Sequence, residues 1–209
     1  MGLDMYMVRK RKQNRGKLKI YEWETPMSRN FYKDGVIIHT AYWDDKEKAF
    51  DLKRAPKRKQ YDYYIDNLEV AYWRKANQIH KWFVDNVQQG KDDCGDYKVE
   101  YRHLSELLGI VTAILDKVKL VEGMVSNGYS YKKNIFGKLK KVYNKEKGLV
   151  IDNKKYCKKM LPTADGFFFG STEYNEYYYR DLEYTKEVLT KILENYDFDK
   201  ETLIYHSSW

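Results

Sequence analysis

The chain has 209 residues, of which 43% are hydrophobic and 33% are charged, and its formal net charge at pH 7 is +8. This hydrophobic content excludes the class of disordered proteins, and the length suffices for one well-formed core. The two cysteines are too few for a disulfide scaffold, and no run of about 18 apolar residues predicts a membrane-spanning helix, so we expect a cytoplasmic protein without a membrane partner.

Charge and aromatic content both bear on the kind of partner. The 39 basic and 31 acidic residues leave a basic excess, which favours nucleotides, nucleic acid or an acidic protein surface. The 21 tyrosines suit a surface that binds a flat or extended molecule, because a half-buried tyrosine keeps its hydroxyl in water. The alternative is that tyrosine replaces phenylalanine and leucine in a wet core.

The first 60 residues predict β-strands. Alternation of polar and apolar side chains favours strands at residues 3–8 and 17–23, and a third strand at 36–43 follows an Asp-Gly turn signal. Residues 53–59 hold five basic side chains and predict a solvated loop. A phosphate-contacting arm is the alternative for this basic loop.

Residues 68–89 predict the clearest helix, which ends at Gly90. At 100° per residue, four apolar side chains share one face of this helix. They are Tyr72, Ala76, Ile79 and Phe83. Lys75 falls inside the apolar arc, so we expect its ammonium group to reach solvent or to meet a buried anion.

The same predicted helix presents Trp73, Asn77 and His80 on adjacent turns. A planar ring would stack on the tryptophan while the amide and the imidazole supply directional hydrogen bonds. The alternative is a core helix whose asparagine and histidine satisfy backbone groups.

The second half alternates strands and helices. Residues 97–99 predict a strand, and residues 101–118 predict a helix with a regular leucine-rich stripe. A last helix is predicted to begin after Ser171 or Thr172 as its N-cap and to reach about residue 194, and a strand closes the chain at 203–206.

These elements predict a single α+β domain over residues 1–209, in which one mixed or antiparallel sheet packs against about three main helices. Residues 10–60 and 121–156 are expected to be variable excursions from this fold. The second of them is basic, is punctuated by glycine and asparagine, and shows little periodicity apart from a hairpin pattern.

A second group of candidate residues follows the three phenylalanines at 167–169. A Gly-Ser-Thr turn that opens a helix offers backbone N–H groups and hydroxyls to an anion. Tyr174 and Tyr178 are four residues apart and share one helical face, so with Arg180 they would clamp an aromatic or phosphorylated ligand. The alternative is an ordinary capped helix with a tyrosine-rich surface.

A catalytic alternative involves the acidic loop 92–96. Its carboxylates lack the downstream glutamate of a calcium loop, but one of them can serve as partner or metal ligand to His80 as general acid or base. Cys94 lies among these acids, which disfavour its thiolate, so we expect a structural role for it. No cofactor motif is present, and no cofactor is expected.

Several of these segments also carry a resemblance. The start at 1–6, the stretch 72–84, the stretch 166–174 and the ending 206–209 resemble a family of uncharacterised phage and prophage proteins. The resemblance covers most of the chain except the two excursions. It implies a phage-encoded accessory protein that acts inside a bacterium, where such proteins counter host defence or redirect host metabolism.

We therefore expect a non-catalytic protein that sequesters a small anionic nucleotide-type ligand, such as a host immune signal. One predicted wall of the site is Trp73, Asn77 and His80, the other is Ser171, Thr172, Tyr174 and Tyr178, and the positive charge comes from Arg74, Lys75 and Arg180. A nucleotide hydrolase or phosphodiesterase is the first alternative. The second is an inhibitor of a host defence protein, docking on an acidic protein or on nucleic acid through basic clusters at 53–59 and 138–141. The sequence leaves open whether the protein forms a homo-oligomer.

Overall fold

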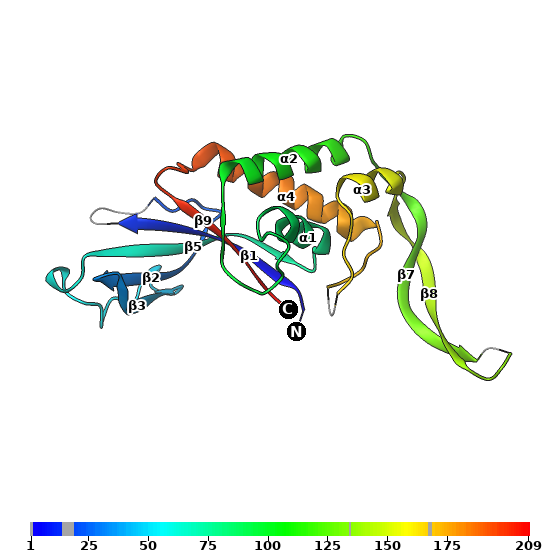
Figure 1. The fold of residues 1–209 in the computed structure, drawn as a ribbon, viewed down its shortest axis with the longest axis horizontal. Helices are drawn as coiled ribbons and strands as arrows, with labels where there is room; N and C mark the ends of the chain where they lie inside the picture. Colours follow the sequence, from blue (N-terminus) through cyan, green and yellow to red (C-terminus); the bar gives the residue numbers. More distant parts are fainter. Residues whose placement is uncertain (1, 14–18, 134, 167–168) are drawn as a thin grey trace.

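The computed structural model describes residues 2–13, 19–133, 135–166 and 169–209 (Figure 1). Its strands are β1 (Asp4–Gln13), β2 (Thr25–Lys33), β3 (Val36–Asp44), β4 (Ala49–Phe50), β5 (Tyr63–Arg74), β6 (Tyr97–Val99), β7 (Leu120–Lys133), β8 (Leu139–Ile151) and β9 (Thr202–Ser208). Its helices are α1 (Asn77–Asn86), α2 (Tyr101–Leu115), α3 (Lys154–Met160) and α4 (Glu176–Asn195), with a short 3-10 turn, η1 (Arg58–Gln60).

The α+β prediction is confirmed, and the main sheet is antiparallel. Within the described residues it has seven strands in the order β4-β3-β2-β5-β1-β9-β6, whereas β7 and β8 form a separate two-stranded ribbon. Helices α1, α2 and α4 lie on one side of the β5-β1-β9 part of the sheet (Figure 1). None of the helices in the described ranges is both long and apolar enough to cross a bilayer.

The main core lies between those helices and the central strands. Alternate side chains of β1, including Met5 and Met7, are completely buried against apolar side chains of the helices, as period-two patterning requires. Leu203 and Tyr205 extend the same face from β9. A smaller cluster around Phe31 lies under the β2-β3 end of the sheet.

The helix predicted at 68–89 is wrong in its first half, because that stretch completes strand β5 and only Asn77–Asn86 is helical. The register of β5 against β1 shifts where Met7 pairs with Ala71 and Val8 pairs with Glu69, so Val70 is an extra residue. Both Val70 and Ala71 are consequently buried. This bulge breaks the period of two and imitates a helical spacing.

Two further boundaries differ from the predictions. Residues 19–23 form no strand, and the remainder of the strand predicted at 17–23 lies outside the described residues. Helix α4 begins at Glu176 rather than after Ser171 or Thr172, because the side chain of Asn175 caps it. The side-chain amide oxygen of Asn175 accepts the N–H groups of Tyr177 at 3.0 Å and Tyr178 at 3.4 Å.

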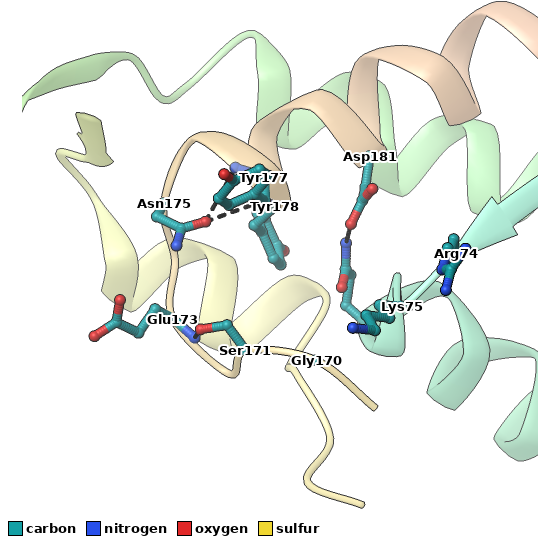
Figure 2. A pocket seen from close by; sticks show the side chains of 10 residues that line it. Arg74, Lys75, Gly170, Ser171, Glu173, Asn175, Tyr177, Tyr178 and Asp181 are labelled. Atoms are coloured by element: carbon teal, nitrogen blue, oxygen red, sulfur yellow. Dashed lines mark hydrogen bonds between the residues drawn. The ribbon is translucent and has the colours of Figure 1, made fainter. Parts of the chain in front are cut away.

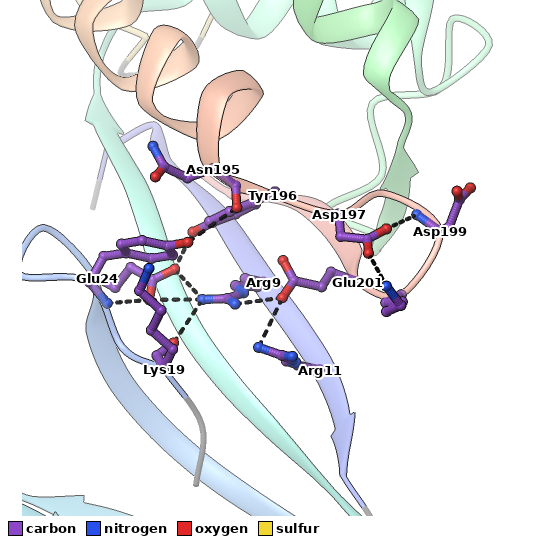
Figure 3. Close-up of polar contacts among 11 residues, drawn as sticks. Arg9, Arg11, Lys19, Glu24, Asn195, Tyr196, Asp197, Asp199 and Glu201 are labelled. Carbon is purple, nitrogen blue, oxygen red and sulfur yellow. Dashed lines mark hydrogen bonds and ion pairs between the residues drawn. The ribbon is translucent and has the colours of Figure 1, made fainter.

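A buried ionic cluster joins the start of the chain to its end (Figure 3). The Arg9 guanidinium on β1 donates to both carboxylate oxygens of Glu24 at 2.7 and 2.9 Å and to Glu201 at 2.5 Å. The Tyr196 hydroxyl also donates to Glu24. Because all four side chains are buried, the charges depend on one another for compensation.

The basic segments predicted as excursions lie at opposite ends of the molecule. The loop 53–59 and the turn η1 precede β5 at one end, and the β7-β8 hairpin projects from the other end, beyond α3 (Figure 1). The two basic clusters, 53–59 and 138–141, therefore do not form one continuous surface.

Candidate functional site

A cavity of about 370 Å³ opens between the β5-α1 turn and the segment that leads into α4 (Figure 2). Its volume lies within the range of small-molecule sites, which is about 300–1,000 Å³. The lining residues are Arg74, Lys75, Gln78, Gly170, Ser171, Glu173, Asn175, Tyr177, Tyr178 and Asp181. These residues come from the two stretches that the sequence predicted as opposite walls, but none of Trp73, Asn77 and His80 is among them.

The cavity depends on two backbone positions in the left-handed region. Lys75 has φ 61° and its N–H donates to the carbonyl of Leu3 at 2.8 Å, which turns the chain sharply from β5 into α1. Gly170 has φ 93° and lies directly against Lys75, since a Cβ at position 170 would come within 2.9 Å of the Lys75 Cβ. A left-handed non-glycine residue in a wall of a cavity is backbone strain of the kind that concentrates at functional sites.

Asn77 holds the two walls together. Its amide nitrogen donates to the carbonyls of Phe169 at 3.1 Å and Ser171 at 3.0 Å, and its amide oxygen accepts the N–H of Ala164 at 3.1 Å. The side chain is completely buried and fully used by these bonds. Asn77 therefore positions the wall of the cavity and does not itself face the hollow.

Two cations stand at the mouth of the cavity. The Arg74 side chain is 64% exposed, and its nearest carboxylate oxygen, on Asp4, lies 3.9 Å away. Lys75 is also exposed, and no ion pair of its ammonium group is found among the described residues. Both charges are thus available to an anionic ligand.

Asp181 is the opposite charge inside the cavity. It projects from α4 toward Gln78, whose amide nitrogen donates to Oδ2 at 2.9 Å (Figure 2). Burial raises the pKa of this carboxyl to about 6, and the hydrogen bond from Gln78 only partly opposes that effect. At neutral pH the cavity therefore holds a poorly solvated carboxylate that a neutral amide alone supports.

Glu173, the second acid of the lining, is committed to the protein. Its Oε2 accepts the Ser126 N–H at 3.0 Å and its Oε1 accepts the Ser126 hydroxyl at 2.6 Å. Burial would raise the pKa of Glu173, but these bonds and two nearby lysines outweigh it and hold the pKa below its usual value. The link connects the cavity wall to strand β7.

The aromatic side chains predicted for the site lie mostly in the core. Trp73 is buried and donates from Nε1 to the Thr185 hydroxyl at 2.9 Å, so its ring offers no open face to a ligand. Tyr174 is buried with its hydroxyl accepting the Thr163 N–H at 3.2 Å. Tyr178 lines the cavity, but it is nearly inaccessible and donates to the Leu161 carbonyl at 2.8 Å.

Of the remaining predicted residues, Ser171 lines the cavity, whereas Thr172 and Arg180 do not. Arg180 instead pairs with Glu176 on the surface of α4. Sequence reasoning missed Gln78, Asp181 and the exposed ring of Tyr177.

His80 is a buried structural residue. Its Nδ1 lies 2.8 Å from the Tyr205 hydroxyl and its Nε2 lies 3.0 Å from Asp92 Oδ2, so both ring nitrogens are occupied. Trp209 donates from Nε1 to the other oxygen of Asp92 at 3.0 Å. The histidine–carboxylate pair that the hydrolase alternative required does form, but its imidazole is buried and neither residue lines the cavity.

The other carboxylates of the acidic loop point to different partners. Asp93 accepts the Tyr97 hydroxyl at 2.8 Å, and Asp96 pairs with Lys10 at 3.2 Å. Across the described ranges, no three His, Cys, Asp or Glu side chains come together in a way that would hold a metal ion.

Comparisons with protein-family models, with curated proteins and with solved structures yield no match for this chain. The candidate site therefore rests on its own geometry and charge.

Proposed function

We propose that this protein binds and sequesters a small anionic ligand of the nucleotide class in the cavity between the β5-α1 turn and α4. The observation that carries the proposal is the combination of two exposed cations, Lys75 and the weakly paired Arg74, with the poorly solvated carboxylate of Asp181 in one hollow. Such a cavity suits a molecule that has an anionic end and a hydrogen-bond-donating end.

A nucleotide meets both requirements. Its phosphate would lie against Arg74 and Lys75, with the Ser171 hydroxyl as a further donor, since Ser171 Oγ already accepts the Glu173 N–H at 3.1 Å. Ribose hydroxyls or an exocyclic amine would donate to Asp181. The ring of Tyr177 is 73% exposed at the rim and offers a stacking surface for the base.

The resemblance to phage and prophage proteins supports testing nucleotide immune signals of a bacterial host first. Sequestration is favoured over hydrolysis because His80 is buried and neither it nor its partner Asp92 is among the residues that line the cavity. A non-catalytic binder needs only stacking and charge-assisted hydrogen bonds.

Isothermal titration calorimetry tests the proposal with a nucleoside monophosphate, a cyclic dinucleotide and ADP-ribose, with inorganic phosphate as the minimal anion. We expect Asp181→Asn and Lys75→Asn each to weaken binding about 10- to 100-fold, the worth of one charge-assisted hydrogen bond. Asparagine at position 75 removes the charge yet tolerates the left-handed backbone.

The matched control is Lys81→Asn, which removes a cation from α1, the helix that follows Lys75, but outside the cavity, where Lys81 pairs with Asp85 at 2.7 Å. Absence of binding across the panel would overturn the proposal, as would equal affinities for the wild type and both cavity variants. Chromatography of the incubated nucleotides separates capture from hydrolysis, because sequestration returns the ligand unchanged.

A further inference from the structure

The β7-β8 hairpin forms an arm that the cavity does not use. It comprises 14 residues of β7 and 13 of β8, and at about 3.3 Å per residue it extends about 45 Å. Its inner half contacts the body through buried Ile151, the Ser126–Glu173 bonds and a bridge between Val150 and Asn175. The rest projects into solvent (Figure 1).

The outer half of this arm carries charge of one sign. Residues 129–143 hold five lysines and no acidic residue. The two acidic side chains of the arm, Glu122 and Glu146, lie nearer the root, where Asn127 donates to Glu146 at 2.7 Å. The outer half therefore has a net charge of +5 without an internal counter-charge.

One face of the outer ribbon carries two directly opposed lysines. Lys132 and Lys140 are direct cross-strand partners, so their ammonium groups lie on the same face. Like charges in opposed positions destabilise a ribbon, and a bound polyanion would remove that cost. This arrangement is costly for the free protein and favourable in a complex with phosphates.

The opposite face combines lysine with aromatic rings. Tyr129 pairs with Tyr143 and Tyr131 pairs with Lys141, so these side chains share a face. The Lys141 ammonium lies 3.9 Å from the ring centroid of Tyr129 and 5.0 Å from that of Tyr143. All three tyrosines are more than half exposed, which leaves rings free to contact sugars and bases.

Shape and apolar content favour one class of polyanion. The major groove of B-DNA is about 12 Å wide and admits a two-stranded ribbon, whereas the major groove of A-form RNA is too narrow for side chains to enter. Ile135 at the tip is 92% exposed and Leu139 is 65% exposed. Proteins that bend DNA insert such apolar side chains between base steps.

We propose that the β7-β8 arm binds double-stranded DNA, with its outer lysines on the phosphates and its tyrosines and apolar tip against the groove. A bulge in which Asn127 and Gly128 oppose the single residue Asn144 adds one residue to β7, shifts the register and bends the ribbon, which directs the outer half away from the line of its root. The arm thus has the charge, the width and the curvature that a groove requires.

Fluorescence anisotropy of the full chain with a labelled duplex of two helical turns tests this inference. Four to five lysine–phosphate contacts predict that affinity falls about 150- to 500-fold between 50 and 200 mM salt. We expect single-stranded DNA, duplex RNA and anionic lipid vesicles to bind more weakly than the duplex at the same salt concentration.

Paired variants locate the contact. Lys132→Gln with Lys140→Gln should weaken duplex binding about 60-fold near 0.1 M salt and make the logarithmic salt slope shallower by about 2. Lys53→Gln with Lys57→Gln lowers the net charge equally, from +8 to +6, at the other end of the molecule and should leave the slope unchanged. Replacing Lys132 and Lys140 by arginine should restore binding, and Ile135→Ser should weaken binding without changing the slope.

Three results would overturn the inference: no duplex binding at 50 mM salt, an equal loss in the 53–57 control, or a preference for RNA, single strands or vesicles. The arm variants leave every residue of the cavity unchanged. Failure of DNA binding is therefore distinguishable from failure of nucleotide binding.

Discussion

Replacing Asp181 by asparagine should make the protein more stable while it weakens ligand binding. The carboxyl has a pKa of about 6 in the folded protein against an ordinary 3.8, so the fold binds its proton more tightly than the unfolded chain does. Above the folded pKa this difference costs about 3 kcal/mol of folding free energy, at about 1.36 kcal/mol per pKa unit. Because the side chain keeps some contact with solvent, we expect about 1–2 kcal/mol.

The sign of the pH dependence follows from the raised pKa. The penalty is complete above about pH 6, shrinks as the pH falls from 6 toward 3.8, and is absent once Asp181 is protonated in both states. Urea unfolding followed by circular dichroism should therefore show an advantage of about 1–2 kcal/mol for Asp181→Asn near pH 8 and almost none near pH 4. The corresponding rise in Tm is about 2–8 °C.

Glu183→Gln is the matched control, because it removes a carboxylate from an exposed position on the same helix and should change stability by less than about 0.5 kcal/mol. The reasoning is refuted if Asp181→Asn gains nothing near pH 8, or if its gain persists unchanged near pH 4. A gain in stability with a loss of affinity is the behaviour expected of a residue retained for function.

Three further predictions concern the packing and the backbone of the fold. Arg9→Ala leaves the buried Glu24 without its cation and leaves Glu201 with Arg11 at 3.3 Å, so it should cost about 3–5 kcal/mol in urea unfolding, whereas Lys10→Ala, in an exposed pair, should cost less than about 1 kcal/mol. Gly170→Ala should lower stability by about 1–3 kcal/mol and reduce nucleotide binding, while Gly109→Ala, at an open position in α2, should raise stability by about 0.5–1 kcal/mol. In a Cys94→Ser background, Cys157 should react with a thiol reagent only after unfolding, because burial raises its pKa to about 11, and rapid labelling of Cys157 in the native protein would contradict this.

Much of the fold could be predicted because local pattern and tertiary burial agree there. Helix α2 has a leucine stripe of period 3.6 whose members are buried, and β9 alternates buried and half-buried side chains. Strand β3 follows its turn signal, Asp34 and Gly35, as expected. In each case one signal is sufficient because nothing interrupts the period.

Prediction failed where an irregularity changed the period. The bulge in β5 places Leu68 and Ala71 on the core side, three residues apart, and this spacing is typical of a helix. The composition of that stretch, rich in tyrosine with isoleucine, valine and tryptophan, was the contrary signal for a strand. The spacing of apolar residues in one strand cannot reveal a bulge, because a bulge is defined by the pairing with the neighbouring strand.

The candidate site was predicted only in part, again because a local backbone irregularity changed the direction of its side chains. The facing of the two segments follows from their chemistry, but the strand-to-helix turn at Lys75 sent Trp73 inward and left Arg74 at the surface. Asp181 could have been noticed, because it falls at helical spacing between Tyr178 and Thr185, on the buried side of α4. A carboxylate in an otherwise uncharged, buried arc is a signal for a functional position.

Glu173 and Asn175 each belong to two structures at once, since both line the cavity while Glu173 holds Ser126 of β7 and Asn175 bridges Val150 of β8. The inner part of the β7-β8 arm is therefore attached directly to the rim of the cavity. A tilt of about 10° at its mounting moves the far end by about 8 Å, given a length of about 45 Å. Since the two strands lie about 4.8 Å apart, a displacement of about 0.8 Å of one strand relative to the other at the rim is enough for this tilt, so the arm enlarges a movement at the cavity about tenfold at its lysine-bearing end.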